Sequence, residues 1–574
     1  MNKLFKYMSS YKKEAVLGPL FKLLEALFEL FVPLVVADII DIGIAKGQEG
    51  KGDIIKYMLL LVALAFVGFV FSVTAQYFAA KASVGFVTRI RHALFSHIGK
   101  LSYSELDKVG TAKFITRMTS DVNQVQTGMN LALRLLLRSP FVVFGAMIMA
   151  FTIDVKISLI FLVVIILLSV VVFGITLITM PLHKKVQTNL ETLTHSTKEN
   201  LTGARVIRAF CKEDDEVSSF GKNNDLFAKG ESFVGKISAL TNPLTFIIIN
   251  TGIAVLVWSG SIKINIGTLS QGDVVALYNY MSQILVELVK LANLIVTISK
   301  SLACATRISD VLEIPFIEDK GEEYTSQGDV SFENVSFRYE GAGDLSLTGI
   351  TFSAKEGETI GVIGGTGDGK TTLINLIPAF YKATEGVVKV GGKNVNDYSE
   401  KSLRSKIGIV PQKATLFHGS VRDNMKWGKK DATDEEIITA LEIAQAKDFV
   451  MEKEGGLDFE IEAGGKNLSG GQRQRLTIAR AIVGNPKILI LDDSSSALDY
   501  LTDLNLRRAI STLPQNPTVF IVSQRASSVL HADKIIVLED GVVVGEGTHK
   551  DLLDTCVAYK EIYDTQYSSQ EGTK

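Results

Sequence analysis

Residues 364–371 combine glycines, a lysine and a threonine in an order that suits the binding of phosphate groups. The segment consists of Gly364, Gly365, Thr366, Gly367, Asp368, Gly369, Lys370 and Thr371. The glycines let successive backbone N–H groups turn toward phosphate oxygens, the lysine adds a mobile positive charge, and the threonine offers a hydroxyl to Mg²⁺. A strand-like run at residues 359–363 precedes the segment, and a helix-like run from Thr372 to residue 380 follows it, which is the context that a phosphate-binding loop requires.

A second candidate site is a pair of aspartates, Asp492 and Asp493, at the end of the apolar run 487–491. A carboxylate at the end of a buried strand is placed to complete the shell of a phosphate-bound Mg²⁺, so we expect Asp492 to be a metal ligand. A buried strand with a solvated acidic end would have the same pattern. The phosphate-binding loop elsewhere in the chain favours the metal-binding interpretation.

The composition shows what surrounds these motifs. A chain of 574 residues holds several domains, which excludes a single small binding module. The net charge of −2 gives no basic excess for nucleic acid, so we expect no nucleic-acid partner. Because 47% of the residues are hydrophobic and only 21% charged, one part of the chain must be very apolar.

The apolar part is the first half, where we expect six membrane-spanning helices. Three segments without charged residues are each long enough to cross a bilayer, and three further candidates carry charges. The uncharged segments are residues 57–80, 157–182 and 237–262; the charged ones are residues 17–44, 129–153 and 274–299. The long stretches 81–128 and 183–236 are rich in lysine and arginine, so the positive-inside rule puts them and both termini in the cytoplasm. As helix pairs they would project about 35 Å from the membrane.

Some charges fall inside these expected spans. Glu25 and Glu29 are one helical turn apart, as are Arg134 and Arg138. An ionisable residue in a membrane is a functional hypothesis by default, so these side chains could bind a cationic or amphiphilic substrate. The alternative is that opposite charges pair between helices or reach an interface.

The character of the chain changes after residue 310. We expect a transmembrane domain at residues 1–310, a polar linker with Pro and Gly at 311–328, and an α/β domain of alternating short strands and helices at 329–574. The three cysteines lie far apart in the sequence and indicate neither a disulfide nor a metal cluster.

A motif between the phosphate loop and the aspartate pair connects the sequence to a family. Ser469, Gly470, Gly471 and Gln472 follow Leu468 and precede a basic helix-like run. With this signature the chain resembles an ABC transporter half of the exporter type, an α-helical transmembrane domain joined to an α/β ABC nucleotide-binding domain. The resemblance implies binding of ATP with Mg²⁺ between two such halves. It also implies roles for Tyr339 in stacking on adenine, for Gln412 beside the metal, and for Asp499 in the loop after the aspartate pair. By analogy with this family, the tips of the two long cytoplasmic stretches fall near residues 107–114 and 207–215.

Two positions depart from the pattern of this family. Its active members carry glutamate where this chain has Asp493, and histidine where it has Gln524. The combination resembles the degenerate subunit of heterodimeric bacterial multidrug exporters, which implies a slow ATP site here and a second half-transporter as partner. The expected cargo is a small hydrophobic or amphiphilic compound that is moved across the plasma membrane. Membrane lipid is expected to surround the helices. A homodimeric lipid or peptide exporter and an ATP-gated membrane regulator are the alternatives.

Overall fold

The computed structural model describes residues 4–316, 319, 321–325 and 327–571, with the side chains of 568–571 left out. The chain forms two compact units. The first consists of Met1–Gly99 and Ala112–Ile314, and the second of Lys100–Thr111 and Pro315–Lys574. A short segment from the first half of the chain therefore belongs to the second unit. The linker expected at 311–328 includes residues 317, 318, 320 and 326, which lie outside the described residues.

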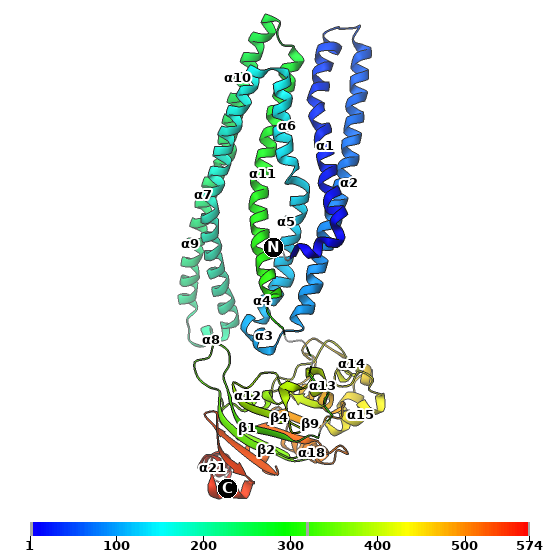
Figure 1. Cartoon of the computed structure of the whole chain (residues 1–574). Coiled ribbons are helices and arrows are strands. Elements are labelled where there is room, and N and C mark those ends of the chain that lie inside the picture. Colours follow the sequence, from blue (N-terminus) through cyan, green and yellow to red (C-terminus); the bar gives the residue numbers. More distant parts are fainter. Residues whose placement is uncertain (1–3, 317–318, 320, 326, 572–574) are drawn as a thin grey trace. The chain divides into compact units, whose positions relative to one another are not determined.

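The first unit is built from long helices (Figure 1). They are α1 (Lys12–Asp38), α2 (Lys51–Ile98), α4 (Thr111–Thr116), α5 (Val122–Leu135), α6 (Arg138–Ile153), α7 (Val155–Thr202), α8 (Ala204–Ala209), α9 (Glu213–Ala239), α10 (Thr241–Ile266) and α11 (Gln271–Leu312). At 1.5 Å per residue, the 48-residue helices α2 and α7 are each about 70 Å long, far more than a bilayer requires. They continue from apolar membrane segments into the polar stretches that the sequence places in the cytoplasm.

Five helical runs in the described part of the chain are long and apolar enough to cross a membrane. They are Lys51–Ile98, Thr111–Ile153, Val155–Thr202, Glu213–Ile266 and Gln271–Leu312. Helix α1 is the sixth expected crossing, and it carries charged residues along its middle. It packs along α2 and also contacts α6 and α11. Partners for its charges come from α2, where Lys81 pairs with Glu14, and from α6, where Arg138 pairs with Glu29.

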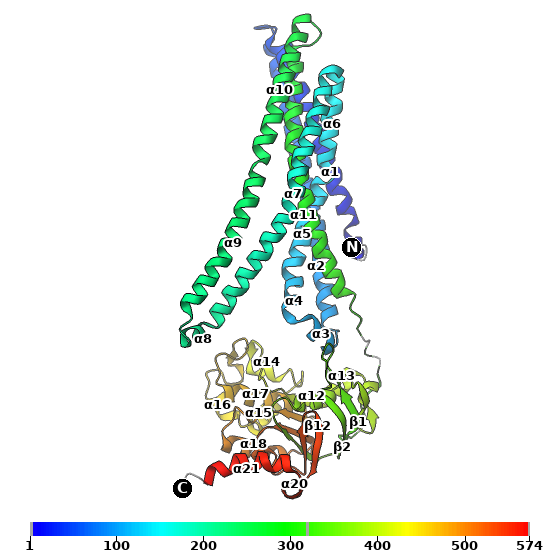
Figure 2. The ribbon, with the colours of Figure 1, turned by 90° about the vertical axis from the view of Figure 1, so that its left-hand side faces the viewer.

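Packing within the first unit separates two groups of helices at the cytoplasmic end. A core that includes Phe161, Leu168, Leu256 and Tyr280 joins α7, α10 and α11. Further along, α7 and α9 lie side by side and separate from α2, α5 and α11 as they approach α8 (Figure 2). The result is a helical unit with two long cytoplasmic extensions.

The second unit contains two main sheets. Its strands are β1 (Val330–Phe337), β2 (Leu347–Ala354), β3 (Thr359–Gly364), β4 (Glu385–Val390), β5 (Lys393–Asn394), β6 (Ile407–Val410), β7 (Gly419–Ser420), β8 (Glu460–Ile461), β9 (Ile488–Asp492), β10 (Thr518–Ser523), β11 (Lys534–Glu539) and β12 (Val542–Gly547). One sheet has the order β2-β1-β4-β5 and is antiparallel; the other has the order β12-β11-β3-β10-β9-β6 and is parallel except for β12. The near-continuous apolar strands β3, β9 and β10 are buried on both faces, as central parallel strands must be.

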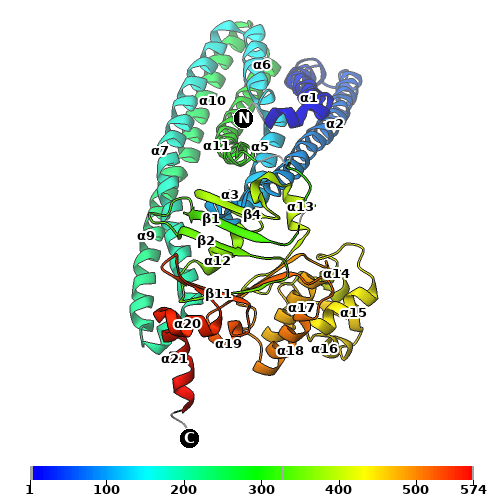
Figure 3. The ribbon, with the colours of Figure 1, turned by 60° about the horizontal axis from the view of Figure 1, so that its bottom comes forward.

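Helices surround the sheets of the second unit. They are α3 (Tyr103–Val109), α12 (Lys370–Leu376), α13 (Glu400–Arg404), α14 (Val421–Met425), α15 (Asp434–Ile443), α16 (Lys447–Met451), α17 (Gly470–Ile482), α18 (Tyr500–Ser511), α19 (Ala526–Val529), α20 (His549–Thr555) and α21 (Val557–Glu571). Helices α14 to α18 gather beside one end of the sheets, while α19, α20 and α21 lie together near another (Figure 3). One core fills the space between the two sheets, and a second lies under α15 and α17.

Candidate nucleotide-binding site

Parallel pairing brings the separate motifs of the second unit to one edge. Strand β10 lies between β3 and β9, and Val522 pairs with Val362 on one side and Asp492 on the other. The chain leaves all three strands at the same end, so the phosphate loop, the aspartate pair and Gln524 all emerge there. This is the edge at which ligands bind in open α/β sheets.

The phosphate loop has the backbone that its glycines predict. Gly367 and Gly369 adopt left-handed conformations, with φ of +98° and +88°, and a side chain at Gly369 would collide with the backbone oxygen of Ser346. Gly365 N–H donates to the carboxylate of Asp368, which holds the start of the loop. The loop then leads directly into α12, whose first residue is Lys370.

Lys370 is the buried cation of the site. Its ammonium donates to the backbone oxygens of Gly364, at 3.1 Å, and Gly365. Burial lowers the pKa of this lysine, while the nearby carboxylates of Asp368 and Asp493 act in the opposite direction. An anion bound in the loop would compensate the desolvated charge, which is the role expected of this residue.

Thr371 and Asp492 lie together as expected for a Mg²⁺ site. The Thr371 hydroxyl is 3.1 and 3.0 Å from the two carboxylate oxygens of Asp492. Burial raises the pKa of Asp492; the hydrogen bond from Thr371 lowers it and the charge of Asp493 raises it further. With the amide of Gln412 in the same cavity, these are the hard oxygen donors that Mg²⁺ uses together with phosphate oxygens. Bound Mg²⁺ would neutralise charge on the phosphates.

A cavity of about 650 Å³ joins these groups and is large enough for a nucleotide. Of the predicted residues, it is lined by Tyr339, Thr366, Gly367, Gly369, Lys370, Thr371, Thr372, Gln412, Asp492, Asp493 and Gln524. The lining does not include three other predicted residues of the phosphate loop, which are Gly364, Gly365 and Asp368. The cavity is also lined by Ser346, Asp540 and Gly541, which were not predicted because no sequence motif singles them out.

Tyr339 stands at the edge of this cavity. Its hydroxyl is 3.1 Å from that of Thr372, and its ring packs edge-on against Phe337 and Tyr381, with centroid distances of 4.8 and 5.3 Å. These contacts fix the plane of the ring. The arrangement fits the predicted stacking on adenine.

Asp493 and Gln524 are the two positions that depart from the family pattern. Asp493 has a left-handed backbone with φ of +46°, and its N–H donates to the Val522 carbonyl at 2.9 Å. Gln524 follows β10, and its Oε1 is 3.5 Å from the hydroxyl of Thr366. Both side chains therefore lie beside the phosphate loop.

The signature residues lie outside the cavity. Ser469 caps α17 through a reciprocal pair of hydrogen bonds with Gln472, at 3.0 and 3.3 Å. Gly470 is exposed, and a methyl group added there would meet no atom within 4 Å. Asp499 caps α18 by accepting from Thr502 N–H at 2.9 Å. The capped start of α17 is thus an open helix N-terminus that suits an anion supplied from outside this chain.

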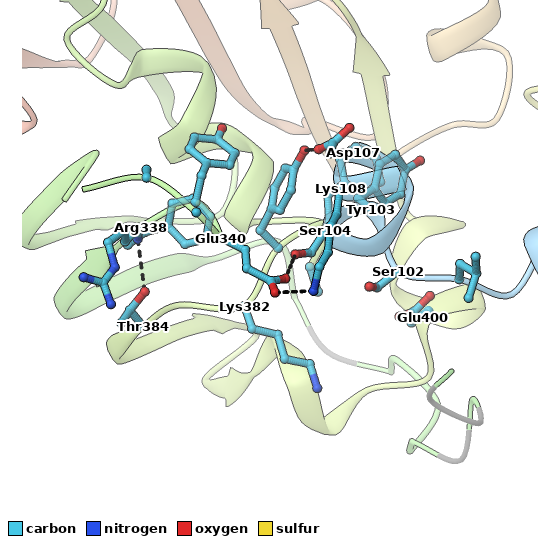
Figure 4. Close-up of a pocket in the computed structure, with 18 of the residues that line it drawn as sticks. Ser102, Tyr103, Ser104, Asp107, Lys108, Arg338, Glu340, Lys382, Thr384 and Glu400 are labelled. Atoms are coloured by element: carbon cyan, nitrogen blue, oxygen red, sulfur yellow. Dashed lines mark hydrogen bonds and ion pairs between the residues drawn. The ribbon is translucent and has the colours of Figure 1, made fainter. Parts of the chain in front are cut away.

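Helix α3 lies beside Glu340, the residue that follows Tyr339 (Figure 4). Asp107 accepts a 2.5 Å hydrogen bond from the hydroxyl of Tyr381, and Lys108 forms a 2.6 Å ion pair with Glu340. The hydrogen bond and the opposite charges of the Lys108–Glu340 pair raise the pKa of Lys108 and lower the pKa of Glu340. Helix α3 overlaps the start of the expected range 107–114. The partners of Asp107 and Lys108 could not be foreseen from sequence spacing.

Three of the four charges expected inside the spans, Glu25, Glu29 and Arg138, form ion pairs. Arg138 contacts Glu29 at 2.5 Å and Glu287 at 2.6 Å, and Ser139 also donates to Glu287. Lys22 of α1 pairs with Glu25 of the same helix. These contacts favour the structural alternative over direct substrate binding.

Comparison with known proteins agrees with this architecture. The ABC transporter transmembrane region family matches residues 16–288, and the ABC transporter family matches residues 347–496. An uncharacterised ABC transporter ATP-binding protein of Bacillus subtilis, YfiB, is 34% identical over 100% of both chains. YgaD of the same organism, named for multidrug export, is 32% identical over 99% of both, and an ATP-dependent lipid A-core flippase of Hahella chejuensis is 30% identical over 99% of this chain and 100% of its own.

The fold has a solved counterpart. A bacterial Atm1-family ABC exporter with ATP bound matches with a TM-score of 0.81 at 22% identity, over 97% of this chain and 98% of that one. The matched regions cover both the helical unit and the α/β unit. The chain is a multi-pass plasma membrane protein with a cytoplasmic ATP-binding domain, and it belongs to the ABC transporter family as an exporter.

Proposed function

We propose that this chain is one subunit of a heterodimeric ABC exporter and that its own ATP site hydrolyses slowly. The observation that carries the proposal is the position of Asp493 and Gln524 on the wall of the cavity that also holds Lys370 and Asp492. The binding groups are thus intact, while the two groups expected to act on the attacking water and the terminal phosphate are altered.

Each change has a physical consequence. Aspartate is one methylene shorter than glutamate, so its carboxylate is displaced by about 1 Å, and a misplacement of that size can cost about a hundredfold in rate. The hydrogen bond between its backbone N–H and Val522 fixes the main chain of Asp493, which limits how far the residue can move to compensate. Gln524 cannot become cationic beside a developing negative charge.

The signature residues 469–472 support a second role for this chain, in the ATP site of the partner subunit. Ser469 and Gln472 hold the start of α17 in a capped conformation at an exposed surface. In a head-to-tail pair of ABC domains this end of α17 would meet the ATP held by the partner. The chain would then contribute to a fast site while holding ATP in its own slow site.

The proposed cargo is a small hydrophobic or amphiphilic compound. The relatives named for multidrug export and for lipid A-core transfer support this class. The pairing of Arg138 with Glu29 and Glu287 assigns those charges to helix packing, so apolar surface would provide most of the cargo affinity. ATP-driven closure of the nucleotide domains would pull on the long cytoplasmic helices and change the side from which the membrane domain is open.

The proposal is tested by comparing steady-state ATPase of the chain purified alone with that of the complex recovered with its partner. We expect the isolated chain to bind ATP with turnover at least about tenfold below that of the complex. Asp493→Glu should raise hydrolysis by the isolated chain, whereas Asp431→Glu, at an exposed position, should leave it unchanged. Rapid cooperative hydrolysis by the unmodified chain would overturn the proposal and favour a homodimeric exporter.

A further inference from the structure

The C-terminal helix α21 is anchored beside the nucleotide site. Tyr559 is fully buried and packs in one cluster with Ile363, Ala526 and Val529. Ile363 belongs to β3, immediately before the phosphate loop, and Ala526 begins α19. The hydroxyl of Tyr559 also lies 2.8 Å from Nδ1 of His549, and this contact joins α21 to α20. The first turn of α21 is therefore part of the core of the second unit.

One side chain of α21 reaches the loop that carries Gln524. Oε1 of Gln566 accepts from the Ala526 N–H at 2.9 Å, and its Nε2 donates to the Gln524 carbonyl at 2.8 Å. The two bonds span Arg525, so a single amide satisfies one backbone acceptor and one backbone donor, as a neighbouring strand would. Gln566 lies outside the cavity and has no part in the predicted nucleotide chemistry.

Further hydrogen bonds hold the rest of this loop. Arg507 of α18 donates to the carbonyls of Ser527 and Ser528, both at 2.8 Å. The Arg525 N–H donates to the hydroxyl of Ser523 at 3.0 Å. Among the described residues, the side-chain hydrogen bonds to the backbone of Gln524 and Ala526 come from Gln566. Helix α21 therefore holds the backbone on both sides of Arg525.

We infer that Gln566 is a positioning residue that latches the Gln524 loop and thereby sets the preference of this site for ATP over ADP. The inference rests on the proposed role of Gln524 beside the terminal phosphate. We call the two hydrogen bonds between the Gln566 amide and the backbone of Gln524 and Ala526 the latch. With the latch formed, the carbonyl of Gln524 is fixed and the side-chain amide of Gln524 stays beside the phosphate loop. Without the latch, the loop samples other conformations and a contact made only with the terminal phosphate weakens, while binding of the adenosine and the first two phosphates is preserved.

The variant that isolates the latch is Gln566→Met. Methionine is similar in length and can keep the packing of the helix, but it can make neither hydrogen bond. Lys560→Ala, on the same helix at an exposed position, is the matched control. Gln524→Ala removes the group through which the latch is inferred to act.

The measurement is equilibrium binding of the full-length purified chain to the non-hydrolysable ATP analogue adenylyl imidodiphosphate and to ADP, each with Mg²⁺. We expect Gln566→Met to lower the preference for the triphosphate about fivefold while changing ADP affinity less than about twofold. Gln524→Ala should have a similar effect, and the double variant should be no worse than Gln524→Ala, because two changes that act through one contact are not additive. Lys560→Ala should bind as the unmodified chain does.

A second measurement tests the latch without nucleotide. Amide hydrogen exchange at Ala526 should be about tenfold faster in Gln566→Met, with unchanged exchange in β3 and an unchanged melting temperature. Equal weakening of both nucleotides, or unchanged exchange at Ala526, would overturn the inference. If Gln524→Ala leaves the triphosphate preference intact, the proposed role of Gln524 fails. If that variant lowers the preference and Gln566→Met does not, the latch alone fails.

Discussion

The hydroxyl of Thr371 lies within hydrogen-bond distance of both carboxylate oxygens of Asp492, although the two residues are 121 positions apart in the chain. The contact joins the start of α12 to the end of β9. It brings together one neutral and one anionic oxygen donor at the place where a phosphate-bound Mg²⁺ is expected. The pKa of Asp492 is raised mainly by burial, so the affinity of this site for Mg²⁺ should depend on pH.

We expect the affinity for ATP with Mg²⁺ to fall on acidification at a higher pH than for an ordinary aspartate. The carboxylate binds the cation and the protonated acid does not, so protonation competes with Mg²⁺. A raised pKa means that this competition begins above the usual value of about 3.9. Asp492→Asn should weaken Mg²⁺-dependent binding at least about tenfold and flatten the pH dependence, as measured by titration calorimetry with and without Mg²⁺. An equally steep dependence in the variant would assign it to another group.

The contact between Tyr381 and Asp107 leads to a second prediction. Tyr381→Phe keeps the ring that packs on Tyr339 but removes the hydroxyl that donates to Asp107. Because α3 connects α2 to α4 along the chain, we expect transport to fall severalfold while ATP affinity stays within about twofold. Transport and ATPase assays of the same complex in liposomes measure both quantities. Tyr324→Phe, which removes a hydroxyl bonded to the Gln327 carbonyl elsewhere in the unit, is the control.

Much of the nucleotide site could be predicted from sequence because its parts are local motifs. The phosphate loop needs glycines at positions with positive φ, and a strand followed by carboxylates ends at the edge where that loop lies. Asp540 and Gly541 could not be found in this way. They reach the cavity through the turn between β11 and β12, and nothing in that turn distinguishes it from other turns.

The membrane charges show the limit of periodicity in the other half of the chain. The spacing of Arg134 and Arg138 shows that they share a helical face, but the partners of Arg138 come from α1 and α11, which are distant in sequence. The choice between a substrate site and an ion pair therefore depended on tertiary packing. The position of Lys100–Thr111 with the second unit is a similar case, since its partners Glu340 and Tyr381 are more than 200 residues away.

The buried carboxylate of Glu287 should matter more for stability than the partly exposed one of Glu29. Glu287 is 3% exposed and contacts Arg138, Ser139 and Lys290, whereas the side chain of Glu29 is 42% exposed. Breaking a buried pair typically costs about 3–5 kcal/mol because it leaves a charge without a partner. We expect Glu287→Gln to lower the melting temperature in detergent by several degrees and Glu29→Gln to have a much smaller effect. Equal losses would show that exposure does not distinguish the two contacts.

The last prediction uses the different positions of Lys370 and Ser469. Lys370 lies in the cavity of this chain, whereas Ser469 caps the exposed N-terminus of α17 outside it. If two ABC domains pair head to tail, these residues act on different ATP molecules. Changing each of them alone should therefore damage different sites.

Ser469→Arg places a long cation at the start of α17, removes the hydroxyl that caps the helix, and blocks the approach of the partner's nucleotide. It should abolish nearly all ATPase activity of the proposed heterodimer. Lys370→Ala removes a phosphate contact in the proposed slow site alone, so nucleotide occupancy there should fall while about a third or more of the turnover remains. Steady-state ATPase and bound-nucleotide counts on the purified complex separate the two outcomes, with Lys466→Ala, at an exposed position before the signature, as the control. If Lys370→Ala were as damaging as Ser469→Arg, the two sites would be equivalent or inseparable, because a contact confined to a slow site cannot by itself stop a fast one.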